Sequence, residues 1–228
     1  MKILSLNQDP GIGGAKKKGA SVHLQAIREA FAAMGHEVIA LDDPDGHRLE
    51  TLCESSCDPD SIDLVYERYA LGKVSGSRFA ERHGIPHILE VNAPLSEEAA
   101  RWRQAVPDAA GETAEREVFA KARHVIAVSP DTKRYSLERG AHNDSVTVIA
   151  NGFDSGVFYP RDKGACKERT GIARDQFVIG FHGRLRPWHH FETLVEAVAL
   201  LVEEGLPLHL LTIGEGDYLE LSRPKLDA

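Results

Sequence analysis

Short apolar runs alternate with amphipathic helical stretches along most of this chain, and this alternation constrains its fold more than any other feature. The apolar runs start at residues 3–6 and recur up to residues 146–149, with apolar residues at helical spacing between them. Such a pattern is typical of a doubly wound α/β domain with a mostly parallel sheet. We therefore predict a Rossmann-like domain over residues 1–160.

A second series of the same kind begins further along the chain. Apolar runs at residues 177–181 and 208–213 flank one amphipathic helical stretch. Two buried strands joined by a helix form a βαβ unit, and ligands of such sheets bind at the carboxyl ends of the strands. We predict a linker over residues 161–176 and the first βαβ unit of a second Rossmann-like domain over residues 177–228.

Composition excludes several classes of function and location. The 35 acidic against 27 basic residues give a formal net charge of −8, which argues against nucleic-acid binding through a basic face. The number of cysteines is three, so they cannot all be paired in disulfides within the chain, which suits a reducing compartment. No apolar run approaches the roughly 20 residues that a membrane span needs. We expect a cytoplasmic protein, with peripheral membrane contact as an alternative.

Two loops at predicted carboxyl ends of strands have the composition of phosphate-binding segments. Residues 7–20 contain four glycines and the run Lys16-Lys17-Lys18 just before a predicted helix, whose N-terminus would attract an anion. The glycine spacing is not that of a dinucleotide fingerprint, so a flexible, solvated loop is the alternative. The second loop carries Arg184, Arg186 and His189, and an anionic ligand is its first functional interpretation. Ordinary surface arginines are the alternative.

Several segments in their order resemble one enzyme family. The segments are KKGASVHLQAIREAFAAMGHEVIAL, DLVYERYAL, IPHILEVNAPL, HVIAVSP, VIANGFDSGVFYP and GFHGRLRPWHHFETLVEA. In this order they resemble the family 4 retaining glycosyltransferases of the GT-B fold. The resemblance implies two Rossmann-like domains, an N-terminal one for the acceptor and a C-terminal one for a nucleotide-diphosphate sugar. It also implies sugar transfer with retention of configuration and without a metal or other cofactor.

One motif of the family is missing. The resemblance implies two glutamates, separated by seven residues, deeper in the donor domain, and no such pair follows Gly216. We therefore expect a chain truncated within the donor domain, so an inactive remnant with weak or no donor binding is the alternative function. A half-built second sheet would also expose apolar surface and favour self-association. A nucleotide-sugar epimerase of the same fold is a third interpretation.

The resemblance assigns roles to individual residues. Arg184 and His189 would hold the donor diphosphate, because fixed cations stabilise the charge that grows on the leaving group. Gly13 and Gly14 match the family's glycine loop and would approach the donor from the other side of a cleft. Asn92 stands where many members have a histidine that touches the sugar or the acceptor. Asparagine hydrogen-bonds hydroxyls but cannot act as a base, and a helix cap is its alternative role.

The neighbouring predicted strand ends in Glu67, Arg68 and Tyr69, which we expect to line the same cleft. A local Glu67–Arg68 ion pair is the alternative for the first two. The base and sugar of the donor are not encoded in a pattern that we recognise. The same holds for the acceptor, which is a saccharide, a lipid or another small molecule.

Overall fold

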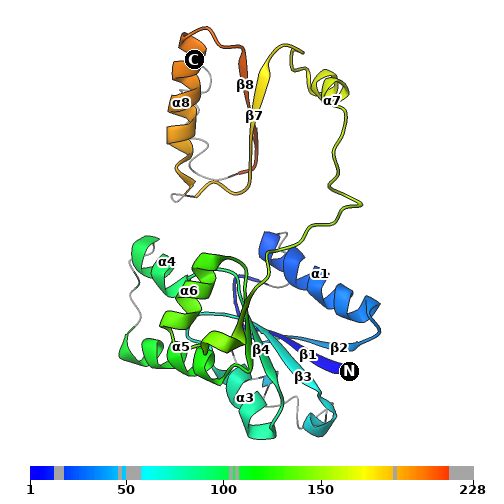
Figure 1. Ribbon diagram of the computed structural model, residues 1–228, viewed down its shortest axis with the longest axis vertical. Helices are drawn as coiled ribbons and strands as arrows, with labels where there is room; N and C mark the ends of the chain where they lie inside the picture. The colour runs from blue at the N-terminus through cyan, green and yellow to red at the C-terminus, as the bar shows by residue number, and fades with distance from the viewer. Residues whose placement is uncertain are drawn as a thin grey trace. The chain divides into compact units, whose positions relative to one another are not determined.

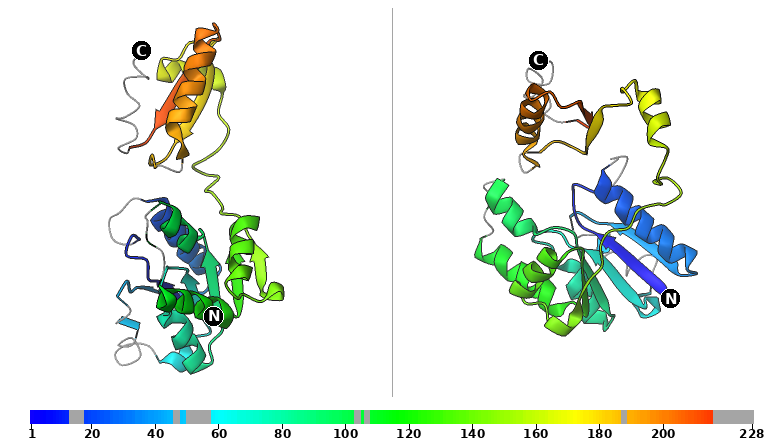
Figure 2. Two further views of the ribbon diagram at one scale, coloured as in Figure 1. Left: turned by 90° about the vertical axis from the view of Figure 1, so that its left-hand side faces the viewer. Right: turned by 45° about the horizontal axis from the view of Figure 1, so that its top comes forward.

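The computed structural model describes residues 1–12, 18–45, 48–49, 58–102, 105, 108–186 and 189–215. The chain forms two compact units, Met1–Gly152 and Phe153–Ala228 (Figures 1 and 2). Unit 2 thus begins several residues before the predicted linker at 161–176. That predicted linker is not extended throughout, because helix α7 (Lys163–Thr170) forms within it and its N-cap Asp162 accepts a hydrogen bond from the backbone of Ala165.

Unit 1 contains one six-stranded sheet in which every neighbouring pair of strands is parallel. In spatial order the strands are β2 (Glu37–Asp42), β1 (Lys2–Asn7), β3 (Leu64–Arg68), β4 (His87–Val91), β5 (His124–Ala127) and β6 (Val146–Val148). This order places β1 and β3 side by side. From β1 the chain continues to β2 at one edge of the sheet, whereas from β3 it continues through β4 and β5 to β6 at the other edge. The crevice at their carboxyl ends is therefore the topological switch point, where ligands of open α/β sheets bind.

The helices of unit 1 begin and end at local signals. They are α1 (Gly19–Ala33), α3 (Ser75–His83), α4 (Leu95–Trp102), α5 (Ala109–Lys121) and α6 (Pro130–Glu138), with 3-10 turns at Pro59–Ser61 and Asn143–Ser145. Ser129 and Thr132 form a reciprocal capping box ahead of α6, and Pro130 occupies its first turn, as the sequence predicts. Along the described ranges, no helix combines the length and the apolar character that crossing a bilayer requires.

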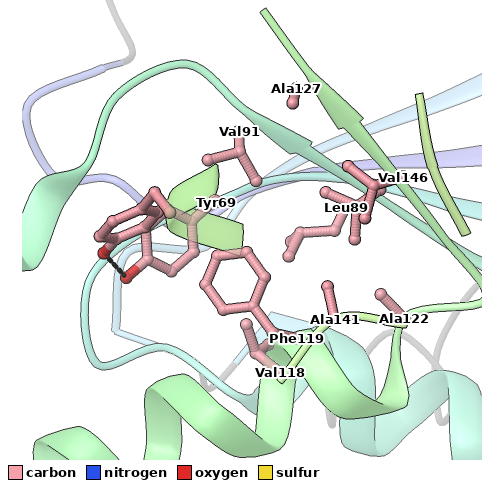
Figure 3. Packing of buried hydrophobic residues seen from close by; sticks show 11 residues of the cluster. Tyr69, Leu89, Val91, Val118, Phe119, Ala122, Ala127, Ala141 and Val146 are labelled. Carbon is pink, nitrogen blue, oxygen red and sulfur yellow. Dashed lines mark hydrogen bonds between the residues drawn. The ribbon is translucent and has the colours of Figure 1, made fainter. Parts of the chain in front are cut away.

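The main core of unit 1 lies on one face of the sheet, between β4, β5 and helices α5 and α6. Figure 3 shows Leu89, Val91 and Phe119 in this cluster, together with Tyr69. Since consecutive strand residues point to opposite faces, Glu90 points away from this core, toward α1. Helix α1 itself contributes a single buried residue, Leu24. The face that carries this core is mostly apolar, and the face beneath α1 is polar near its carboxyl edge.

Unit 2 contains the predicted βαβ element. Strands β7 (Phe177–His182) and β8 (Leu208–Ile213) pair in parallel, and helix α8 (Phe191–Glu203) connects them. Leu185, Phe191 and Val195 form its small core, against which Phe181, Leu194 and Leu210 pack. The strand, loop, helix and strand that the sequence predicts for this region are therefore confirmed.

Candidate functional site

The carboxyl end of β1 is organised by Asn7, whose side chain is 1% exposed. Its Nδ2 donates to the carbonyl of Ile12 at 3.2 Å and to Oδ1 of Asp42 at 3.3 Å, and its Oδ1 accepts from the amide of Asp9 at 3.1 Å. One amide thus ties the start of the glycine-rich segment to both β1 and β2. The predicted diphosphate contacts Gly13 and Gly14 lie outside the described residues.

The other side of the switch point is formed by Arg68, the last residue of β3. Its Nη1 lies 3.9 Å from Oε2 of Glu90, and Oε1 of the same carboxylate lies 2.5 Å from Nε2 of His23 on α1. Burial, together with the nearby Glu90 carboxylate, raises the pKa of Tyr66. Burial lowers the pKa of the Arg68 guanidinium, and Glu90 opposes that effect. The result is a polar network of α1, β3 and β4.

The prediction that Glu67, Arg68 and Tyr69 line one cleft is wrong for two of the three. Glu67 is 1% exposed, and its Oε2 lies 2.9 Å from Nε2 of His87 on the opposite face of the sheet from α1. Tyr69 is buried in the main core (Figure 3). Alternation along a strand sends adjacent side chains to opposite faces, so they cannot share one surface. The alternative of a Glu67–Arg68 ion pair is replaced by the pairs Glu67–His87 and Arg68–Glu90.

A buried polar network surrounds Tyr69, and the sequence contains no local signal for it. The hydroxyls of Tyr69 and Tyr135 both donate to Oε1 of Glu115, and Tyr135 also contacts the hydroxyl of Ser96 at 2.8 Å. Arg139 stacks over the Tyr135 ring at 4.1 Å. Burial is the main cause that raises the pKa of both tyrosines, so their hydroxyls remain donors. The members come from distant segments, and the network joins α4, α5 and α6.

Asn92 follows directly after β4 at the carboxyl edge. Its Oδ1 accepts from Nδ2 of Asn151 at 3.4 Å, a long contact between two predicted loop residues. Its own Nδ2 is buried and has no hydrogen-bond partner among the described residues. The side chain of Asn92 therefore bonds toward Asn151 rather than acting only as a cap for α4, and it retains a donor for a further partner.

In unit 2, the start of the loop after β7 is held in place by the end of β8 and the residues that follow it. The amide of Gly183 donates to the carbonyl of Ile213 at 3.0 Å, and the amide of Leu185 donates to that of Glu215 at 2.9 Å. A Cβ atom on Gly214 would lie 1.9 Å from the carbonyl oxygen of Gly183, so only glycine fits there. Gly183 itself has φ of 136°, a conformation that favours glycine. Leu185, 2% exposed, anchors the loop in the small core.

This held loop presents the predicted donor residues. Arg184 is exposed, one residue after the constrained Gly183. Nδ1 of His189 accepts the backbone N–H of Arg186 at 3.2 Å, and the His189 ring packs edge-on against Phe181 at 5.8 Å. Because Nδ1 accepts this hydrogen bond, Nε2 is the ring nitrogen of His189 that can carry a proton.

Helix α8 begins directly after this loop. Its N-cap, His190, adopts a left-handed conformation with φ of 47°, and Phe191 is buried just behind it. The first N–H groups of a helix carry partial positive charge and attract anions. The loop cations and the N-terminus of α8 thus lie within a few residues of each other at the carboxyl edge of β7, an arrangement suited to a phosphate or diphosphate.

Comparison with known proteins finds similarity to glycosyltransferases. Residues 47–152 match a family model described as a glycosyl transferase 4-like domain. A curated relative, the D-inositol 3-phosphate glycosyltransferase of Nocardia farcinica, is 28% identical over 171 residues, which are 73% of this chain and 38% of that protein. The enzyme of the same name from Actinosynnema mirum is 30% identical over 169 residues, or 72% and 40% of the two chains. The chain spans about two fifths of the length of these relatives.

Among solved structures, Anabaena HepE in complex with UDP is similar over the whole of this chain. The TM-score is 0.67 at 21% sequence identity, and the match covers 66% of the HepE chain. At this level of identity the likeness shows the fold alone. With the parallel sheet of unit 1 and the βαβ element of unit 2, it confirms the predicted α/β architecture of GT-B type.

Proposed function

We propose that the protein transfers a sugar from a nucleotide-diphosphate sugar to an acceptor, with retention of configuration, because residues 47–152 match a glycosyl transferase 4-like domain. The donor-binding part of this proposal belongs to unit 2 and the acceptor-binding part to unit 1. Similarity to HepE, which was solved with UDP, supports a uridine nucleotide as the first donor to test. The predicted cytoplasmic location stays a prediction.

The observation that carries the proposal is the constrained segment at residues 183–185. Backbone hydrogen bonds from Gly183 and Leu185 to residues 213 and 215 fix this segment, so Arg184 is presented from a rigid support. A cation that is positioned in advance stabilises charge on a leaving diphosphate without reorganising during the reaction. His189, which the resemblance assigns to the same diphosphate, and the first N–H groups of α8 would add interactions of the same polarity. Together they match the leaving group of a nucleotide-sugar donor.

Unit 1 supplies the proposed acceptor side. Asn92 has a buried amide donor without a partner among the described residues, and Arg68 ends β3 at the switch point. An amide and a guanidinium can orient sugar hydroxyls, but neither takes up a proton at neutral pH. In this proposal Asn92 therefore orients a substrate and is not a catalytic base.

The donor proposal is tested by calorimetry of the chain with UDP, GDP and their sugars. We expect UDP to bind, and Arg184→Ala to weaken that binding by about 1.5–3 kcal/mol, the value of a hydrogen bond to a charged group. Arg174→Ala is the matched control, because Arg174 is an exposed arginine of the same unit that pairs with Glu168 at 3.5 Å. Absence of heat at millimolar ligand would contradict the proposed function. Equal affinities of the two variants would remove Arg184 from the site.

A further inference from the structure

Helix α7 covers one face of the small sheet of unit 2 incompletely. Phe181 and Leu210 pack toward α8, so Val178 and Leu211 point to the opposite face, on the side where α7 lies (Figure 1). All eight residues of α7 are described, and none of them is buried. A Cβ atom added at Gly180, on the same face, would meet no atom of the described residues within 4 Å. This face of the sheet therefore has open space above it.

A groove of about 600 Å³ lies between α7 and this face of the sheet. Its lining combines apolar side chains with more positive than negative charge. The residues that give it this character are Ile172, Phe177, Val178, Lys163, Lys167 and Asp175. Concave, mostly apolar surfaces of this size with a few charged groups are typical binding sites. We call this surface the groove of unit 2.

The C-terminal end of α8 is apolar and acidic. Four apolar side chains are exposed there and form what we call the α8 patch, namely Leu200, Leu201, Val202 and Leu206. The amide of Leu206 donates to the carbonyl of Leu201 at 3.1 Å, which folds residue 206 back onto the last turn of the helix. Glu203 and Glu204 are exposed beside the patch. Helix α8 contains three glutamates and no basic residue, so the patch lies in negatively charged surroundings.

We propose that the groove of unit 2 accepts the α8 patch of a second copy of this chain. An apolar helix surface fits an apolar groove, and the glutamates beside the patch complement the lysines of the groove in charge. Groove and patch are different surfaces of one unit, so a pair of copies leaves one groove and one patch free. The contact is therefore heterologous and can continue to further copies.

This contact is independent of the proposed sugar transfer. Phe177 and Val178, which line the groove, are the first two residues of β7, whereas Arg184 follows the opposite end of that strand. The donor loop and unit 1 supply none of the groove or patch residues. Failure of UDP binding would therefore leave the proposed contact unaffected.

Sedimentation velocity of the full chain at increasing concentration tests the contact, with glutamine substitutions that leave the net charge unchanged. Leu200→Gln changes the patch, and Cys166→Gln places an amide in the groove, whose lining includes Cys166. Thr193→Gln on α8 and Ala165→Gln on α7 are the matched controls, because both residues are exposed and lie outside the patch and the groove lining. Glutamine is a good helix former, so the four variants should retain both helices.

We expect the dissociation constant for self-association to rise about tenfold in Leu200→Gln and in Cys166→Gln, because each buries an amide without a partner in the contact. The two controls should match wild type. Association that neither variant weakens, or that only Leu200→Gln weakens, overturns the assignment of the patch to the groove. A wild-type chain that stays monomeric overturns it as well.

An equal mixture of the Leu200→Gln and Cys166→Gln chains gives the sharpest result. One chain supplies an intact groove and the other an intact patch, so we expect dimers that grow no further. These dimers should form at concentrations at which each variant alone is monomeric. A mixture that stays monomeric at these concentrations overturns the heterologous contact.

Discussion

The Glu67–His87 pair shows how closely single residues are fitted in unit 1. Both side chains are nearly fully buried, with Nε2 of His87 2.9 Å from Oε2 of Glu67. Gly76, in the first turn of α3, faces this pair. A Cβ at Gly76 would lie 2.2 Å from Oε2 of Glu67 and 2.6 Å from a methyl group of Leu6. The pair and the start of α3 can therefore coexist only because residue 76 has no side chain.

Gly76→Ala should destabilise the protein by about 1–3 kcal/mol, the range for overpacking a filled interior. Gly19→Ala is the matched control, because Gly19 also lies in the first turn of a helix and a Cβ there meets nothing within 4 Å. We expect the control to be neutral or stabilising by up to about 1 kcal/mol, as alanine is the better helix former. Urea denaturation measures both. Equal free energies of unfolding for the two variants would contradict the fit described here.

Among the elements, α3 and α5 are joined by charges rather than by apolar contacts alone. Arg78 binds both carboxylate oxygens of Glu117, at 2.8 and 2.7 Å, and Lys121 bridges Glu117 and Glu81 at 2.8 and 2.6 Å. The hydrogen bonds from Arg78 and then Lys121 lower the pKa of Glu117 to about 2. Glu117 therefore stays ionised in the folded protein at acidic pH values at which it is protonated in the unfolded chain.

This pKa sets the pH range over which Glu117 stabilises the fold. Because the folded-state pKa lies below that of the unfolded chain, the contribution is complete above the ordinary glutamate pKa and is lost as pH falls toward about 2. Glu117→Gln should destabilise the protein at pH 7 by up to about 1 kcal/mol, as for a partly exposed ion pair. The difference from wild type should shrink between about pH 4.5 and pH 2. A difference in free energy of unfolding that is independent of pH would contradict this assignment.

At the scale of the whole molecule, the two units differ in how much apolar surface they cover. Among the described residues, unit 1 contains two large buried clusters, whereas the hydrophobic cluster of unit 2 has three buried members. Phe177 and Ile213, on the two strands of unit 2, are 68% and 64% exposed. Exposed apolar side chains on a small sheet favour association with other apolar surfaces.

We expect the 228-residue chain to self-associate through unit 2, and a chain of residues 1–152 to remain folded and monomeric. Both cores of unit 1 lie within residues 1–152, so that part retains its buried contacts. Light scattering gives the mass of each species, and circular dichroism shows whether residues 1–152 unfold cooperatively. A monodisperse monomer of the full chain would contradict the role of unit 2. Self-association of the chain of residues 1–152 would instead show that the surface responsible lies in unit 1.

The sequence by itself determined the alternation of strands and helices, the βαβ element of unit 2 and the resemblance to family 4 glycosyltransferases. These features depend on local periodicity, capping residues such as Ser129 and the order of motifs, all of which can be read along the chain. Arg184 and His189 could be placed in a loop after a strand for the same reason.

Only the tertiary structure decided which residues lie close together in space and which sequence neighbours point to opposite faces of the sheet. Arg68 faces Glu90 and α1, while Glu67 and Tyr69 on either side of it enter the opposite face of the sheet. The links from His23 to Glu90 and from Tyr69 to Glu115 each join residues more than 40 positions apart. Such contacts are set by strand pairing and by which face each helix covers, and neither is a property of a local stretch of sequence.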